Sequence, residues 1–204
     1  MTFKPWRVSK YRKILERLSH YEVINPAVNG SVHCFPGAVV GLKQNSRRFL
    51  NENEMVDSME ELGFQVVVIR PKRMSNLDKF AKVVNRCSVM AEAQGAGLTN
   101  EVFLPDGAVV VQVVPLALDW VASNYFGAPA SEMRLNYLEY KIEPKESSLW
   151  ETYDENDSVI TDPASVISKG YSAFREVYLN AQNIKINVGR FRETLVQAMK
   201  LIDR

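Results

Sequence analysis

A run of small residues in the middle of the chain has the composition of an anion-binding loop. Residues 89–93 (VMAEA) form an apolar stretch typical of a buried strand, and residues 94–97 (QGAG) follow it directly. Because glycine lacks a Cβ atom, the backbone can reverse there through positive φ angles. We expect a short helix over residues 98–104, with Thr99 and Asn100 near its N-terminus. Such a loop offers unpaired N–H groups and the positive end of a helix dipole to a diphosphate.

A second candidate for anion binding is the basic segment 43–48 (KQNSRR), which follows a short predicted strand over residues 38–42. In parallel sheets ligands bind beyond the carboxyl ends of the strands, and both this segment and the glycine loop follow such ends. Lys43 and Arg47 could then form charge-assisted hydrogen bonds with phosphate oxygens. The alternative is that Arg47 and Arg48 only form a solvated surface on the loop.

Other nucleotide and metal motifs do not occur in the sequence. Asn100 stands where a dinucleotide fingerprint has its third glycine, and the Gly-Lys-Ser/Thr ending of a P-loop is missing. Residues 154–157 (DEND) lack the alternating carboxylates that hold a metal ion. We therefore predict no metal and no bound cofactor. His20 and His33 lie apart from any nucleophile pattern, so we interpret both as surface residues.

Composition places the chain among globular proteins. It has 204 residues, of which 46% are hydrophobic and 24% charged, and its formal net charge is +1. That charge gives no reason to expect a nucleic acid or a membrane surface as partner. No window contains the roughly 20 apolar residues of a membrane-spanning helix, and residues 1–10 lack the apolar core of a signal peptide. Cys34 and Cys87 lack the paired spacing of a zinc site, which favours buried thiols.

Strand and helix patterns alternate from residue 38 onwards. The predicted strands are 38–42, 64–69, 89–93, 108–114 and 135–142, the last nearer the sheet edge because its polar and apolar residues alternate. The predicted helices are 51–62, 77–84, 98–104, 120–126, one opened by Asp162 and Pro163, and 188–202. Residues 143–161 are predicted to form a polar loop. This alternation predicts an α/β domain of Rossmann type, with a doubly wound, mostly parallel sheet over residues 38–204 and a lead-in over residues 1–37.

Several segments resemble the plant glycosyltransferases of family 61, which include xylan arabinosyltransferases and xylosyltransferases. The matching segments are KPW…KY (4–11), CFP (34–36), SRRFLNENE (46–54), GAGLTNEVFLPDGAVVVQVVP (95–115), YLEYKI…ESSL (137–149), DP (162–163) and QNIKIN…RFRETL (182–195). Long blocks without gaps are far more specific than a single glycine motif.

The resemblance implies transfer of a pentose or related sugar from a UDP-sugar to a xylan or glycan hydroxyl group, with inversion and without a metal ion, in the Golgi. It also implies the two-Rossmann-domain fold known as GT-B. Residues 38–204 would be its C-terminal, nucleotide-binding half, and residues 1–37 a remnant of the N-terminal domain. The residues it places at the nucleotide sugar are Lys43, Arg47, Gln94, Gly95, Ala96, Gly97, Leu98, Thr99, Asn100, Glu146 and Ser147. It leaves the catalytic base unassigned, and the sequons at Asn29 and Asn156 would be glycosylation sites in a secretory protein.

Three departures from the family pattern favour an alternative function. Gln94 stands where the family usually has histidine, so it can donate a hydrogen bond but carries no charge. Glu92 stands where a small residue is usual, and its carboxylate would repel a diphosphate unless it points away. Between Leu42 and Lys43 the chain lacks a longer segment that family members have, and most of the acceptor-side domain, the expected source of the general base, is missing.

The alternative is therefore a degenerate, non-catalytic domain that binds a nucleotide sugar or serves as a scaffold. We expect the isolated chain to bind UDP weakly and to transfer no sugar, since transfer needs both domains to orient donor and acceptor. A nicotinamide-dependent oxidoreductase is a third alternative, which a fluorescence titration with NAD would test.

Overall fold

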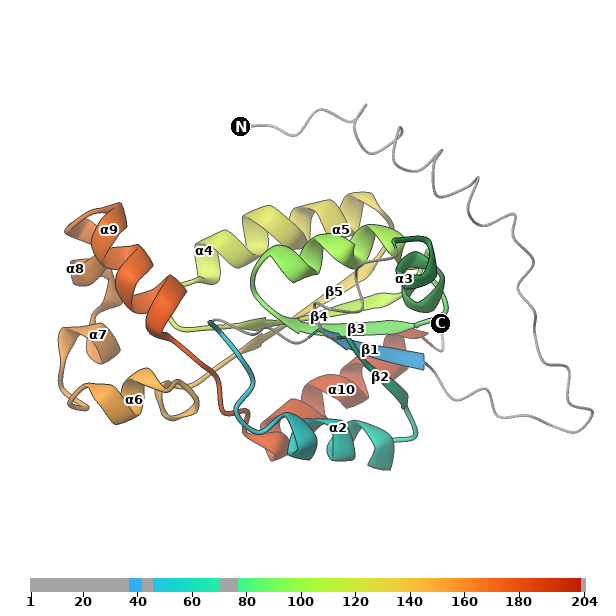
Figure 1. Cartoon of the computed structure of the whole chain (residues 1–204), viewed down its shortest axis with the longest axis horizontal. Coiled ribbons are helices and arrows are strands. Elements are labelled where there is room, and N and C mark those ends of the chain that lie inside the picture. Colours follow the sequence, from blue (N-terminus) through green and yellow to red (C-terminus); the bar gives the residue numbers. More distant parts are fainter. Residues whose placement is uncertain (1–36, 42–45, 70–76, 203–204) are drawn as a thin grey trace, which may run out of the picture. The chain divides into compact units, whose positions relative to one another are not determined.

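A computed structural model describes residues 37–41, 46–69 and 77–202 of the chain. Within these residues five parallel strands form one sheet in the order β2-β1-β3-β4-β5 (Figure 1). The strands are β1 (Gly37–Gly41), β2 (Gln65–Ile69), β3 (Val89–Ala93), β4 (Val109–Val114) and β5 (Asn136–Lys141). The predicted parallel sheet of Rossmann type is confirmed, and so is the position of the last strand at its edge. Each predicted strand lies within one residue of the observed bounds.

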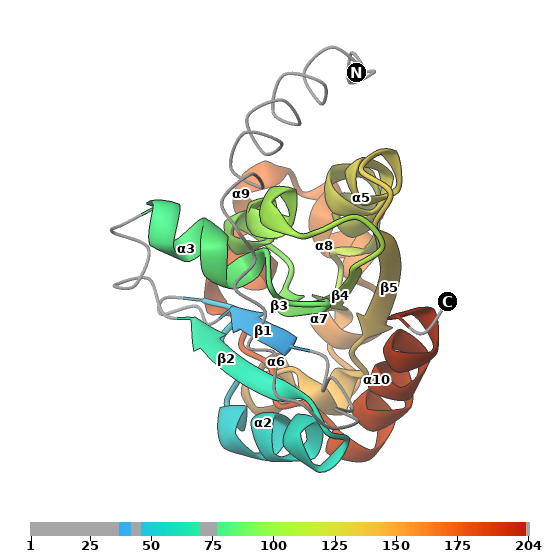
Figure 2. The same ribbon diagram turned by 90° about the vertical axis from the view of Figure 1, so that its right-hand side faces the viewer.

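Helices cover both faces of the sheet, as Figures 1 and 2 show. One face carries α2 (Glu52–Glu61) and α10 (Val188–Ile202). The opposite face carries α3 (Leu77–Val84), the 3-10 helix η2 (Ala96–Phe103), α4 (Asp119–Ala122), the π-helix η3 (Ser123–Gly127) and α5 (Ala128–Glu132). Because both faces are covered, every residue of β3 and β4 is buried. This explains why β4 is an almost unbroken run of valine.

The hydrophobic core is divided between the two faces. Met55 and Met59 of α2 pack with Phe191 and Leu195 of α10 against one side of the sheet. These residues recur at helical spacing in the sequence, and α10 has the bounds that were predicted for it. On the other side, Phe80 of α3 makes an edge-to-face contact with Phe103 of η2, with ring centroids 5.9 Å apart.

The prediction of a polar loop over residues 143–161 is wrong. That stretch contains η4 (Pro144–Glu146), α6 (Leu149–Thr152) and α7 (Ser158–Thr161), and α8 (Pro163–Ser168), α9 (Tyr171–Phe174) and the π-helix η5 (Arg175–Ala181) follow it. These helices have a small core of their own, formed by Leu149, Val159, Ile160, Val166 and Tyr178. Four-residue helices are too short to show a helical period in the sequence. The predicted start of α8 is confirmed, since the Asp162 side chain accepts a hydrogen bond from Ser165 N.

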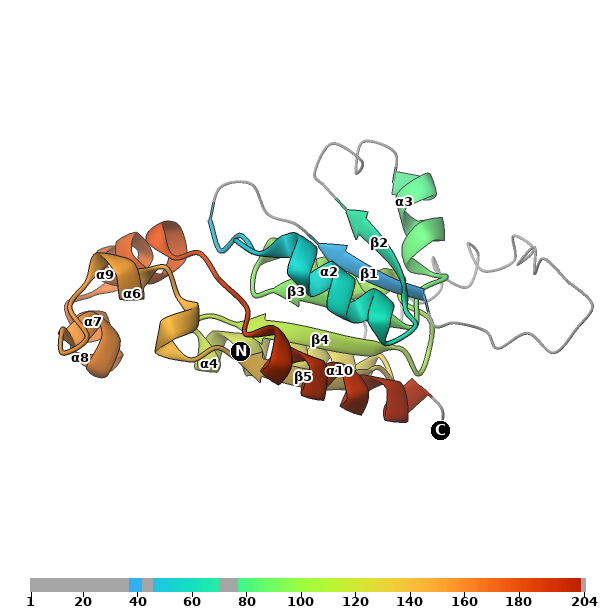
Figure 3. The same ribbon diagram turned by 90° about the horizontal axis from the view of Figure 1, so that it is seen from below.

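The helical segment from α6 to η5 lies beyond the carboxyl ends of the strands, as Figure 3 shows. Among the described helices, none is both long enough and apolar enough to pass through a membrane. Cys87 is a buried free thiol, as predicted, and burial raises its pKa to about 11. The predictions for Lys43, Asn29, Cys34, the two histidines and nearly all of the lead-in concern positions outside the described residues.

Candidate functional site

The sheet changes its winding direction between β1 and β3, and the candidate site lies there. The two strands are neighbours, with Gly41 of β1 opposite Glu92 of β3. The chain then leaves β1 for α2 on one face and leaves β3 for η2 on the other. In doubly wound sheets ligands bind outside the carboxyl ends of the strands at such a point. Of the predicted basic segment the structure describes residues 46–48, which follow the carboxyl end of β1, at the same edge of the sheet as the glycine loop that follows β3.

The glycine loop differs from the prediction in where its helix begins. Gly95 has φ 147° and ψ −170°, a conformation that favours glycine, and η2 starts directly after it at Ala96. Thr99 and Asn100 therefore lie inside the helix and not at its N-terminus. The Thr99 hydroxyl donates to the Ala96 carbonyl at 2.6 Å, and the Asn100 amide donates to the Gly97 carbonyl at 2.7 Å. The two side chains thus stabilise the tight 3-10 turns by which the loop is built.

Two further residues of the loop belong to the core of the domain. Gln94 N donates to Val113 O at 2.8 Å and so continues the pairing of β3 with β4. The side chains of Gln94 and Leu98 are both buried, and Leu98 packs into the hydrophobic core on the η2 face. Leu98 therefore cannot offer its side chain to a ligand. What the loop does present is the backbone of residues 95–97.

The Glu92 carboxylate points toward the glycine loop. A Cβ atom added to Gly97 would lie 1.6 Å from Glu92 Oε1, so the carboxylate occupies the space that a side chain at Gly97 would fill. Only 5% of Glu92 is exposed, which leaves the carboxylate little room to move. The close approach explains why residue 97 has to be glycine in this chain.

We expect Gly97→Ala to lower the free energy of unfolding by about 1–3 kcal/mol, because the new methyl group overlaps the Glu92 carboxylate. Glu92→Ala in the same chain should recover part of that loss, with a coupling of about 1 kcal/mol or more in a double-mutant cycle followed by urea denaturation. Gly189→Ala is the control, since its Cβ would meet Asn187 Oδ1 at an ordinary 3.4 Å. Additive effects of Gly97→Ala and Glu92→Ala would contradict the contact.

Arg47 is held in place by the chain around it. Its backbone has φ 54°, in the left-handed region that costs a side-chain-bearing residue about 1 kcal/mol. Arg47 N donates to Gln182 O at 2.7 Å and Arg47 Nη1 donates to Leu179 O at 2.9 Å. Its Nε–H is buried and has no hydrogen-bond partner among the described residues. Burial also lowers the pKa of the guanidinium, which marks a cation with incomplete solvation.

The two arginines of this segment therefore differ. Arg48 is exposed, so the alternative of a solvated surface describes it well. Arg47 is half-buried, fixed in orientation and left with an unsatisfied N–H donor. A buried donor without a partner is costly, and a charge-assisted bond to an anion would remove that cost.

Residues 182–187, which follow η5, connect the loops at the carboxyl edge. On one side, Ile184 N donates to Arg48 O at 2.8 Å and Leu50 N donates to Ile184 O at 2.7 Å. On the other side, Ser148 N donates to Asn183 O at 2.9 Å and Lys185 N donates to Glu146 O at 2.7 Å. The 182–187 segment thus ties the segment after β1 to the segment after β5.

Gln182 carries the central side chain of this arrangement. It is fully buried, and its Oε1 accepts from Leu116 N at 2.9 Å and from the Ser147 hydroxyl at 3.1 Å. Its Nε2 donates to Leu116 O and to Tyr178 O, each at 3.3 Å. Two acceptor sites and two donor hydrogens are all that an amide has, so the side chain is fully satisfied. It links the end of β4, the segment after β5 and the π-helix η5.

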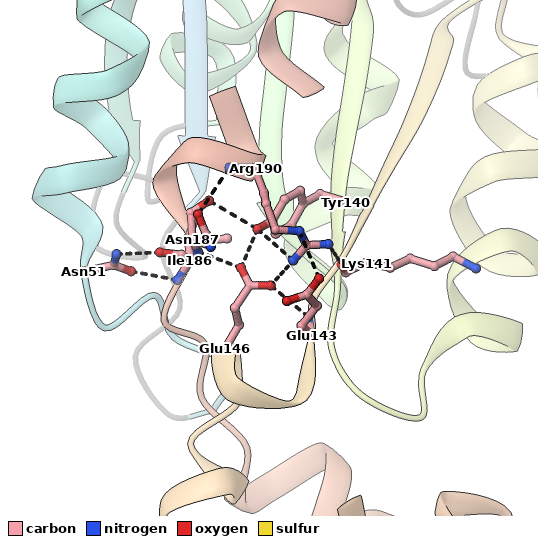
Figure 4. A network of polar contacts seen from close by, with 8 residues as sticks. All are labelled: Asn51, Tyr140, Lys141, Glu143, Glu146, Ile186, Asn187 and Arg190. Atoms are coloured by element: carbon pink, nitrogen blue, oxygen red, sulfur yellow. Dashed lines mark hydrogen bonds and ion pairs between the residues drawn. The ribbon is translucent and has the colours of Figure 1, made fainter. Parts of the chain in front are cut away.

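Glu146 is the centre of a second network, drawn in Figure 4. It is 5% exposed, and its carboxylate accepts from Asn187 N at 2.6 Å and Glu143 N at 2.8 Å, as well as from the Tyr140 hydroxyl and Arg190 Nη1. Burial and the bond with Glu146 raise the pKa of Tyr140. Nearby, Asn51 Oδ1 accepts a hydrogen bond from Ile186 N at 2.9 Å, and Asn51 Nδ2 donates one to Ile186 O at 2.9 Å.

Glu146 and Ser147 are thus occupied within the chain. The Ser147 hydroxyl donates to Gln182 and accepts from Leu149 N at 3.2 Å, and only 2% of the residue is exposed. The structure gives both residues a role in holding the 182–187 segment, whereas the resemblance placed them at the nucleotide. Sequence reasoning assigned no role to Gln182, although the block QNIKIN contains it.

Among the described residues, no three His, Cys, Asp or Glu side chains gather in a way that could hold a metal ion. Metal-independent chemistry stays a prediction.

Comparison with known proteins assigns the chain to a family. Residues 4–111 match the protein family described as Glycosyltransferase 61. The chain belongs to glycosyltransferase family 61. A xylan glycosyltransferase of Arabidopsis thaliana is 38% identical over 156 residues, which cover 76% of this chain and 32% of that protein. In Oryza sativa subsp. japonica, an alpha-1,3-arabinosyltransferase is 32% identical over 249 residues, covering 95% of this chain and 43% of that protein. A beta-1,2-xylosyltransferase of the same plant is 31% identical over 254 residues, covering 97% and 44%.

This family 61 chain thus spans 32% to 44% of the lengths of these relatives. The matches to the two rice enzymes extend over 249 and 254 positions, more than the 204 residues present here. The rice enzymes therefore contain residues inside the matched region that have no counterpart in this chain. The predicted position of the shortening, between Leu42 and Lys43, stays a prediction.

Several family 61 segments within the described part of the chain meet at one place in the fold. Residues 46–54, 137–149 and 182–195 supply the contacts of the 182–187 segment, and residues 95–115 lead from the glycine loop to the end of β4 beside Leu116. What these blocks share is the carboxyl edge of the sheet. The structure thus gives the recognised motifs a common physical setting.

Proposed function

We propose that this domain binds the UDP part of a UDP-sugar at the carboxyl ends of β1 and β3, as part of a glycosyltransferase. Two observations support the proposal: β1 and β3 are neighbouring parallel strands, so Arg47 and the glycine loop both follow carboxyl ends at the same edge of the sheet, and the oriented Arg47 guanidinium retains a buried N–H without a partner among the described residues. Backbone N–H groups of residues 95–97 and the Arg47 guanidinium are groups that recognise a diphosphate.

The chemistry that we propose is transfer of a pentose or related sugar to a xylan or other glycan acceptor, with inversion and without a metal ion. UDP is the leaving group, so negative charge grows on the diphosphate as the bond to the sugar breaks. Donors that are already oriented toward that charge stabilise the transition state without further reorganisation. Arg47 is such a donor because two hydrogen bonds fix it before any ligand arrives. The catalytic base is left unassigned.

The names of the relatives support this substrate class, since they describe transfer of arabinose, of xylose and to xylan. By the same family membership we propose a GT-B architecture, with residues 38–204 as its nucleotide-binding half, and a place in the Golgi. Asn156 fits a secretory setting because it is exposed and lies just before α7. We propose it as a glycosylation site.

One observation favours a second candidate, a non-catalytic domain that binds a nucleotide sugar or serves as a scaffold. The Glu92 carboxylate lies against Gly97 in the loop that would receive the diphosphate. A charged carboxylate beside this loop would oppose a diphosphate held by the same loop. If Glu92 keeps its charge, UDP binding should be weak.

Isothermal titration calorimetry with UDP tests the proposed site. Arg47→Ala should weaken UDP binding by about tenfold or more, because a charge-assisted bond is lost. Arg48→Ala is the matched control, since Arg48 is exposed and makes its described hydrogen bonds through backbone atoms. Equal effects of the two substitutions, or no binding of UDP by the unaltered chain, would contradict the proposal.

The loop itself provides a gain-of-affinity test. Gln94→His with Glu92→Gly should tighten UDP binding by about tenfold, because a carboxylate is removed and a group that can carry positive charge is added. The comparison is made at pH 6 and pH 8, since the imidazole contributes charge only at the lower pH. An unchanged affinity at both pH values would show that the loop does not hold the diphosphate.

A further inference from the structure

We propose that Gln182 is a positioning residue for Arg47, whose orientation it sets through the 182–187 segment and the end of η5. The proposal rests on the proposed function, because it concerns the same anion site. It adds a residue that does not touch the ligand and acts only through another side chain.

Residues 179–182 bind both the backbone and the guanidinium group of Arg47. Its backbone N–H is bound by Gln182 O at 2.7 Å, and its guanidinium is bound through Nη1 by Leu179 O at 2.9 Å. Leu179 lies in the last turn of η5, where carbonyl groups have no helical partner and attract a cation. These two bonds hold Arg47 in its left-handed conformation, φ 54°, which the residue would otherwise leave.

The position of residues 179–182 is in turn set by the Gln182 side chain. Its amide contacts both backbone groups of Leu116 and reaches back to Tyr178 O, so it fixes η5 against the end of β4. The residue after Leu116, Ala117, also has a left-handed backbone, with φ 66°. Of the three described non-glycine residues with positive φ, Arg47 binds the Gln182 backbone carbonyl and Ala117 follows Leu116, which binds the Gln182 side chain. Strained backbone persists only where the surroundings determine it, and here Gln182 provides them.

A purely structural role for Gln182 makes a different prediction. In that case its loss would lower stability as any buried amide does, without a specific effect on Arg47. Asn51 provides the comparison. Its side chain makes two hydrogen bonds with Ile186 at the other end of the same segment, at 2.9 Å each. Asn51→Ala should therefore destabilise the segment without loosening Arg47.

The readout is hydrogen exchange of the Arg47 Nε–H, measured by ¹⁵N NMR on the 204-residue chain without ligand and assigned with Arg47→Lys. Gln182→Glu keeps the acceptor for Leu116 N and Ser147 but loses both donor contacts. It should speed exchange of this N–H by about tenfold, because local opening of the 179–182 region exposes it. Ser147→Ala, which removes only one bond to Gln182, should give a smaller change in the same direction and serves if Gln182→Glu does not fold.

UDP titrations of the same proteins separate the two proposals. Gln182→Glu should weaken UDP binding by about tenfold, and Arg47→Ala should have little further effect in that background, because both substitutions act on one group. Faster Nε–H exchange in a chain that does not bind UDP would support the positioning role and refute the anion site. Unchanged exchange in Gln182→Glu and Ser147→Ala, or an equal increase in Asn51→Ala, would overturn the positioning role.

Discussion

Glu146→Ala should lower the free energy of unfolding by about 3–5 kcal/mol, the range found when one partner of a buried ion pair is removed. The carboxylate is 5% exposed and receives four donors, among them Arg190 Nη1 and the Tyr140 hydroxyl. Removing it takes this acceptor from Arg190, from the Tyr140 hydroxyl and from two backbone N–H groups. Arg190 keeps the exposed Glu143 and Lys141 O, and Tyr140 keeps Asn187 O at 3.3 Å. The loss also frees one end of the 182–187 segment, because Asn187 N is among those donors.

Glu143→Ala is the matched control, measured by urea denaturation beside Glu146→Ala without ligand. Glu143 also pairs with Arg190, at 3.4 Å, but its side chain is 60% exposed. Such a surface pair contributes about 1 kcal/mol or less. If Glu146 served only to contact the nucleotide, its removal would leave the stability of the ligand-free chain unchanged. If Glu146→Ala lowers the free energy of unfolding no more than Glu143→Ala does, the structural role is contradicted and a role of Glu146 in nucleotide binding is favoured.

The sheet could be predicted from the sequence because its strands are short apolar runs between recognisable helices. β3 and β4 are buried on both faces, so their residues carry no alternation that could mislead. The helices from α6 to η5 could not be predicted in the same way. Their small core joins Leu149, Val159 and Tyr178, which are far apart in the sequence and follow no period. Only packing identifies them as one unit.

The candidate site, too, could be predicted from the sequence only in part. The sequence placed Arg47 and the glycine loop at one edge because parallel strands bring their carboxyl ends together. It could not identify Gln182, because a buried glutamine has no signature apart from its partners, which come from three different elements. Family resemblance marks Glu146 and Ser147 as important without saying whether they bind a ligand or the chain. Their hydrogen bonds show which groups of the chain they bind, and contact with the nucleotide stays a prediction.

A row of polar residues crosses the otherwise apolar sheet near the site. Strand register places Glu92, Gln112 and Glu139 side by side on the face that η2 covers. The Tyr137 hydroxyl lies 2.8 Å from Gln112 Oε1 and 3.0 Å from Glu139 Oε1, and its single proton can serve only one of these acceptors. Burial and the neighbouring Glu139 raise the pKa of Tyr137, and the carboxyl group of Glu101 in η2 raises it further.

Glu101 should therefore make the stability of the domain depend on pH. It is 3% exposed, its Oε2 has no hydrogen-bond partner among the described residues, and burial raises its pKa to about 8. In the unfolded chain its pKa returns to the ordinary value near 4.5. Between these values the native state holds a proton that the unfolded state has released. Stability due to this group is complete below the unfolded pKa and falls as pH rises, by up to about 1.4 kcal/mol per pH unit, until the folded pKa is passed.

Glu101→Gln removes the titrating group while keeping its shape, so it should remove this decline. We expect the two proteins to have similar free energies of unfolding at pH 5, and the variant to be more stable by on the order of 3 kcal/mol at pH 8. Urea denaturation at half-unit steps between pH 5 and pH 8.5 measures the difference. Glu132→Gln, which removes an exposed carboxylate from α5, controls for the loss of one surface charge. Parallel pH curves for the unaltered chain and Glu101→Gln would mean that folding does not raise the pKa of Glu101, which would contradict the prediction.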